Sequence, residues 1–119
     1  MSTTLSSCAS SSRVTPQELF GLIEGQSAPL ILDVRSTWEY NSGHVPGAVH
    51  VPFYLTGFRK KSMPNDKGTP IVVYCEHGPR AGLAKLGLKI RGVSDVRYMK
   101  GHMQRWRKLE LPLETQSNE

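Results

Sequence analysis

Six consecutive residues, CEHGPR from Cys75 to Arg80, carry the groups best suited to chemistry. They follow the apolar run IVVY (71–74), which indicates a buried strand, and they contain Gly78 for a tight turn and Pro79 for a helix start. The backbone N–H groups of such a turn and helix start attract an anion and should lower the pKa of a cysteine among them. Cys75 is therefore predicted to be a nucleophilic thiolate. The expected anion-binding loop consists of Glu76, His77, Gly78, Pro79 and Arg80.

Other charged side chains are expected near this loop. Asp33 and Arg35 end a second apolar run; they either orient the loop or, in the interpretation we favour, form a structural charge network. Arg80 has two interpretations of equal weight, because its guanidinium could bind the oxygens of an anionic donor or hold the loop to a neighbouring carboxylate. For His77, exposure to solvent is favoured over a role as a general acid.

Patterns typical of strands and helices alternate along the chain. Short apolar runs predict strands over residues 30–34, 48–51, 71–74 and 95–99. Caps, prolines and apolar spacing predict helices over residues 16–24, 53–61 and 101–109. A short helix around Trp38 to Tyr40 should follow a cap at Ser36, and another helix should run from Pro79 to a stop at Gly92. Residues 64–68 are expected to form a surface loop. Leu83, Leu86 and Ile90 share one face of the helix that follows Cys75.

This alternation predicts an α/β fold with a mainly parallel central sheet of about five strands and helices on both faces. Functional residues of such sheets lie beyond the C-terminal ends of the strands, where Cys75, Asp33 and Arg35 all occur. At 119 residues, the chain should form a single domain over 14–114. We expect a flexible Ser-rich tail over 1–13 and a flexible C-terminus over 115–119.

Composition excludes several classes of protein. A hydrophobic content of 38% is that of a soluble domain, and no apolar run approaches the roughly 18 residues of a membrane helix. Two distant cysteines, Cys8 and Cys75, do not make a disulfide framework, so a reducing, cytoplasmic location is expected. Metal-ligand spacing is lacking, so a metal is not expected. The net charge of +5 lies mainly in the second half of the chain and favours small anions, whereas no motif indicates nucleic-acid binding.

The loop CEHGPR, with LDVRSTWEYNSGHVPGAVHVP before it and KGHMQRW after it, resembles the rhodanese or thiosulfate sulfurtransferase homology domain. Three motifs occur in the family's order: a DVR strand end, a GHVPGA turn and a six-residue loop that begins with Cys. The resemblance runs from about Val14 to Glu114 and implies a parallel sheet covered by helices. It also implies that Cys75 takes a sulfane sulfur from a small anionic donor such as thiosulfate as a persulfide, which the amides of residues 76–80 would hold. The sulfur then passes to cyanide, a thiol or a protein acceptor, without a cofactor.

The chain departs from the family pattern at two positions, and two other functions compete. Lys100 replaces the first of two usual glycines, and Glu76, expected at the pocket rim, is negative where a basic residue is common. Both departures leave the donor open. A phosphatase or arsenate reductase of the related fold would need Arg80 one position further from Cys75. A non-catalytic binding module would be expected to lack the cysteine.

Overall fold

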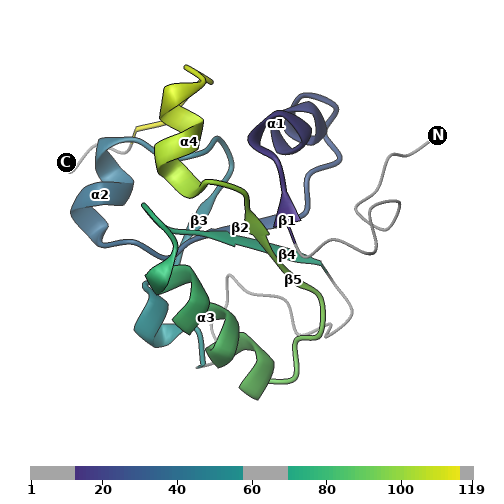
Figure 1. Cartoon of the computed structure of the whole chain (residues 1–119), viewed down its shortest axis with the longest axis vertical. Helices are drawn as coiled ribbons and strands as arrows, with labels where there is room; N and C mark the ends of the chain where they lie inside the picture. The colour runs from purple at the N-terminus through teal and green to yellow at the C-terminus, as the bar shows by residue number, and fades with distance from the viewer. Residues whose placement is uncertain (1–12, 58–69, 116–119) are drawn as a thin grey trace.

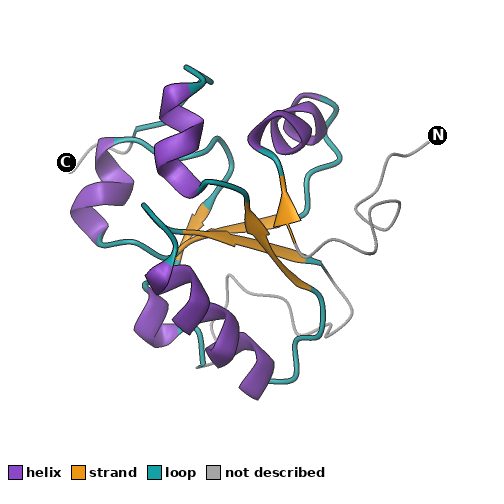
Figure 2. Cartoon of the chain, viewed as in Figure 1, coloured by secondary structure: helices purple, strands orange, loops and turns teal. Residues whose placement is uncertain are grey.

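The computed structural model describes residues 13–57 and 70–115, in which a parallel sheet lies between two layers of helices (Figures 1 and 2). The strands are β1 (Arg13–Val14), β2 (Leu30–Asp33), β3 (Val49–His50), β4 (Ile71–Tyr74) and β5 (Val96–Met99). The helices are α1 (Pro16–Glu24), α2 (Thr37–Ser42), the 3-10 helix η2 (Phe53–Leu55), α3 (Pro79–Ile90) and α4 (His102–Lys108). None of these helices is long and apolar enough to cross a membrane.

The strands follow the order β1-β5-β4-β2-β3, and every pair is parallel. The predicted α/β class, the mainly parallel sheet of about five strands and the helices on both faces are therefore confirmed. Only β1 lacks a counterpart in the sequence-based prediction. It pairs Val14 with Met99 and includes Arg13, a residue that the prediction assigned to the tail. Two residues are too few to show a strand period.

Cys75 continues the central strand toward the α3 side of the sheet. Side chains of a strand alternate between its faces. Ile71, Val73 and Cys75 accordingly belong to the core under α3 and η2, whereas Val72 and Tyr74 belong to the core under α1 and α4. In Figure 1 these two layers lie below and above the sheet, and α2 lies at its left side.

The helix starts follow from local sequence. Thr15 with Glu18, and Ser36 with Glu39, form complete capping boxes at α1 and α2. Of the helix expected over 53–61, residues 53–55 form a 3-10 turn, and 58–61 lie outside the described residues. The expected loop over 64–68, tail residues 1–12 and C-terminal residues 116–119 also lie outside the described residues.

Helix α3 turns small residues toward the sheet. Its buried side chains are those of Ala81, Ala84 and Leu88. The predicted shared face of Leu83, Leu86 and Ile90 is the exposed one. Small buried residues let α3 approach η2 closely, and the Oγ1 atom of Thr56 lies 3.2 Å from the carbonyl oxygen of Ala84.

Candidate active site

The central strand places Cys75 at the C-terminal edge of the sheet. All four residues of β4 are buried, and Cys75 itself is 1% exposed. The amide of Val34 donates to the carbonyl oxygen of Tyr74 at 3.1 Å, which extends the pairing of β2 and β4 beyond the last strand residue. Val34 and Cys75, followed by Arg35 and Glu76, therefore leave the sheet side by side, as expected for the ends of neighbouring parallel strands.

The loop folds back onto the thiol. Gly78 has φ +136°, a conformation that residues with a side chain rarely adopt, and Pro79 is the first residue of α3. This turn brings the amide N–H of Gly78 to the Sγ atom of Cys75, with a nitrogen–sulfur distance of 2.9 Å. The sulfur thus accepts a backbone hydrogen bond close to the N-terminus of a 12-residue helix, an arrangement that stabilises negative charge.

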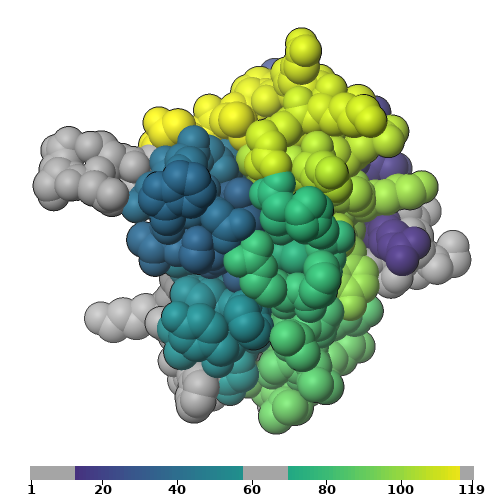
Figure 3. All heavy atoms as spheres, turned by 60° about the vertical axis from the view of Figure 1, so that its left-hand side comes forward, coloured from purple at the N-terminus to yellow at the C-terminus, as the bar shows by residue number. Residues whose placement is uncertain are grey.

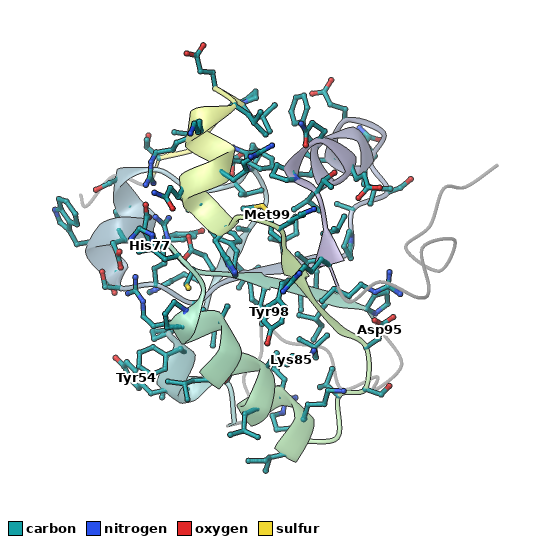
Figure 4. The ribbon with its side chains drawn as sticks, in the orientation of Figure 1. Tyr54, His77, Lys85, Asp95, Tyr98 and Met99 are labelled. Atoms are coloured by element: carbon teal, nitrogen blue, oxygen red, sulfur yellow. The ribbon has the colours of Figure 1, made fainter. Side chains whose placement is uncertain are left out.

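Helix α4 holds the loop from the other side. The amide of Met103 donates to the carbonyl oxygen of Cys75 at 3.0 Å, and that of Gln104 donates to the carbonyl oxygen of Glu76 at 3.2 Å. Because C=O and N–H of a trans peptide point in opposite directions, the amides of Glu76 and His77 point away from α4. His77 is exposed and lies near α2 and α4 in Figure 4, with Nδ1 3.3 Å from Oε1 of Gln104.

Asp33 and Arg35 form a buried charge network beneath the loop. The Arg35 guanidinium donates to both carboxylate oxygens of Asp33, at 2.7 Å for the shortest contact, and to the carbonyl oxygen of Gly43. Burial lowers the pKa of Arg35, but hydrogen bonds and charge from Asp33 outweigh it and leave that pKa raised. Tyr74 donates its hydroxyl to Asp33 at 2.8 Å, and burial raises the pKa of Tyr74 well above its usual value. The network fastens β2 to β4.

Glu76 joins this network to α4. Its carboxylate accepts from Arg35 at 3.3 Å and pairs with Arg107. The side chain is 17% exposed and lines a cavity of about 360 Å³ together with Trp38 and Leu113. Glu76 therefore borders a cavity whose lining residues do not include Cys75, and two guanidinium groups compensate its charge.

Arg80 holds the start of α3 to α2. Its two terminal nitrogens donate to the two carboxylate oxygens of Glu39 at 2.7 and 3.0 Å. The hydrogen bond from Arg80 is the main reason that the pKa of Glu39 falls to about 2. The charge of Cys75 also contributes to the raised pKa of Arg80, after the larger effect of Glu39. The Arg80 guanidinium thus binds a neighbouring carboxylate and holds the loop to α2, which is the arrangement of the second interpretation given for Arg80.

The residues expected at the site come together, but through partners that the sequence does not reveal. Asp33 and Arg35 are linked to the loop by the hydrogen bond from Arg35 to Glu76. No sequence pattern points to the α4 side chains His102 and Arg107; the KGHMQRW motif marks their segment without assigning contacts. Figure 3 shows α2, η2, α3 and α4 meeting on one face of the molecule. Within the described residues, no three His, Cys, Asp or Glu side chains are grouped as metal ligands would be.

The parallel five-stranded sheet between helices, with Cys75 directly after its central strand, places the domain in the α/β class. Residues 15–109 match the Rhodanese-like domain family, and the chain belongs to that family.

Relatives and a solved structure agree with this membership. The chain is 32% identical over 76 residues to the uncharacterized protein YqhL of Bacillus subtilis, covering 64% of this chain and 59% of YqhL. It is 34% identical over 96 residues to the thiosulfate sulfurtransferase GlpE of Pseudomonas savastanoi, covering 80% of this chain and 86% of GlpE. The crystal structure of the Alr3790 protein from Anabaena sp. matches with TM-score 0.77 at 30% identity, covering 86% of this chain and 82% of that one. The chain thus spans somewhat more than half of YqhL and most of GlpE.

Proposed function

We propose that the protein is a sulfurtransferase in which Cys75 carries the sulfur as a persulfide. The donor is a small anionic sulfane-sulfur compound such as thiosulfate, and the acceptor is cyanide or a thiol, including a protein thiol. The observation that carries this proposal is the Cys75 thiol, which accepts the Gly78 amide at the N-terminus of α3. Membership of the family and the likeness to a named thiosulfate sulfurtransferase support it.

The reaction requires two nucleophilic displacements. The Cys75 thiolate attacks the outer sulfur of thiosulfate, the S–S bond breaks, and sulfite leaves with the electron pair. The persulfide so formed keeps one negative charge on its terminal sulfur, which the Gly78 amide and the helix start can stabilise. Cyanide then attacks the terminal sulfur, thiocyanate forms, and the thiolate of Cys75 returns. Protons and electrons balance without a metal or cofactor.

The geometry favours sulfur transfer over phosphoryl chemistry. Surrounding a tetrahedral oxyanion requires a free arginine at the end of the loop. Here four residues separate Cys75 from Arg80, and both terminal nitrogens of Arg80 already donate to Glu39. The alternative of a non-catalytic binding module is disfavoured by the presence of Cys75 itself.

The variant Cys75→Ala tests the assignment. We expect transfer from thiosulfate to cyanide to fall by at least about 1,000-fold, because the covalent step is lost, while the circular dichroism spectrum remains that of the parent. Cys8→Ser is the matched control and should retain the parent's rate under reducing conditions. Substantial residual transfer in Cys75→Ala would contradict the proposal. Hydrolysis of an aryl phosphate that depends on Cys75 would instead support the phosphatase alternative.

A further inference from the structure

His102 begins α4 in an unusual backbone conformation next to the cysteine loop. Its φ is +56°, and the preceding Gly101 has φ +78°. Left-handed backbone is uncommon for a residue with a side chain, although histidine adopts it more often than most. Such a conformation persists where surrounding contacts hold it, so the contacts of this side chain are informative.

The imidazole ring of His102 contacts two residues of the loop. Its Nδ1 accepts a hydrogen bond from the backbone N–H of Cys75, with a nitrogen–nitrogen distance of 3.3 Å. An accepting Nδ1 carries no proton, so the neutral ring has its proton on Nε2. That Nε2 lies 3.3 Å from the place a Cβ atom would take on Gly78, and the ring therefore packs against the turn that delivers its amide to the sulfur.

The surroundings favour the neutral ring. His102 is half-buried, and burial lowers its pKa, with further lowering from the positive charges of Arg13 on β1 and His77 in the loop. The Tyr98 ring of β5 faces it with 6.0 Å between ring centroids. An unprotonated Nδ1 is thus available to the Cys75 amide at neutral pH.

We propose that His102 is a positioning residue that holds the Cys75 loop in the conformation needed for sulfur uptake. The expected effect on reaction rate rests on the proposed sulfur transfer, whereas the contact between His102 and the loop does not. The Nδ1 contact fixes the peptide from which the Cys75 side chain projects, and the ring supports Gly78, whose amide binds the sulfur. Protonation would place an N–H on Nδ1 opposite the N–H of Cys75. Two facing donors repel, so acid should loosen the loop.

The first test examines the contact without any sulfur chemistry. In the 15N-labelled full-length protein, long-range 1H–15N spectra should show the His102 proton on Nε2, and acidification should shift the Cys75 amide resonance together with the His102 ring. His102→Gly removes the ring and accepts the left-handed backbone, and it should speed hydrogen exchange of the Cys75 and Gly78 amides. A proton on Nδ1, or unchanged exchange in His102→Gly, would overturn the proposal.

The second test compares kinetics with thiosulfate. His102→Gly should lower kcat by about tenfold or more with little change in KM, because a misplaced nucleophile reacts slowly. His102→Asn tolerates the same backbone, offers Oδ1 as an acceptor and does not titrate, so it should stay within a few-fold of the parent at pH 8. The ratio of parent to His102→Asn rates should fall as the pH drops below 6.5, because only the parent ring protonates there. Gln17→Asn, at an exposed, uncharged position on α1 away from the loop, is the control and should behave as the parent does.

The outcomes separate this proposal from the proposed function. Equal losses in His102→Gly and His102→Asn, or normal kcat in His102→Gly, would contradict a positioning role even if the parent transfers sulfur. A parent without sulfur transfer, but with amide protection that depends on His102, would refute the proposed function and leave the loop contact established.

Discussion

Glu76 shows how the surroundings of a single residue decide what its charge does. In isolation its carboxylate would repel both a thiolate and a dianionic donor. In the structure Glu76 pairs with Arg35 and Arg107, while Arg35 also pairs with Asp33. These four side chains carry two negative and two positive charges and are neutral together. Removing the carboxylate would leave one net positive charge beside the loop.

Glu76→Gln should therefore raise the second-order rate constant for thiosulfate. An extra unit charge interacting by about 1 kcal/mol with the incoming dianion corresponds to roughly fivefold, and added salt should reduce the gain. Stopped-flow measurement of persulfide formation over a range of ionic strengths provides the check. Glu24→Gln, an exposed position on α1, makes the same change in net charge. An equal effect in that control, or none in Glu76→Gln at low ionic strength, would show that Glu76 does not influence the donor.

At the scale of elements, the close packing of α3 against η2 depends on small residues. A Cβ added at Gly87 would lie 2.6 Å from Oγ1 of Thr56 and 3.0 Å from the backbone nitrogen of Gly57. The Thr56 side chain has little freedom to move, because its hydroxyl lies within hydrogen-bond distance of the carbonyl oxygens of Phe53 and Ala84. Gly82, on the same helix, has open space around its Cβ position.

Gly87→Ala should destabilise the protein by about 1–3 kcal/mol, because the added methyl group overpacks the contact between α3 and η2. Gly82→Ala makes the same chemical change and should instead stabilise by up to about 1 kcal/mol through helix propensity. Midpoints of urea unfolding measured for both variants test the difference. Similar midpoints in the two variants would mean that α3 does not pack on η2 as closely as described.

Local signals were enough to predict most elements. The capping boxes at Thr15 and Ser36 define helix starts because they satisfy free amides within a few residues. Pro79 defines another because the N–H that it lacks would have no partner in the first turn. β1 could not be predicted, since its two residues are stabilised by pairing with distant β5. The spacing of Leu83, Leu86 and Ile90 indicated that they share a helix face but not that this face is exposed. The close packing of α3 leaves room for smaller side chains on its buried face. Contacts between separate elements were not predicted either: Lys85 of α3 has its Nζ atom 4.8 Å from the centroid of the Tyr98 ring of β5, and Figure 4 labels both residues.

At the scale of the whole molecule, the site is assembled from segments far apart in the chain. The strand ends bring Asp33 and Cys75 to one edge, which the α/β pattern predicts. The approach of α4 links Cys75 to His102 across 27 residues, and no periodicity encodes such a contact. Folding of the entire domain is therefore needed to complete the loop. The claim that Cys75 takes up sulfur is best tested on the whole 119-residue chain.

The most direct test of that claim is the intact mass of the protein after incubation with thiosulfate and removal of the excess. We predict a gain of one sulfur atom, located by peptide mapping at Cys75 and absent from Cys75→Ala. Adding cyanide should restore the original mass and release one equivalent of thiocyanate, because the sulfur is held as a transferable persulfide. A parent that gains no sulfur, or a Cys75→Ala variant that gains as much, would contradict the account.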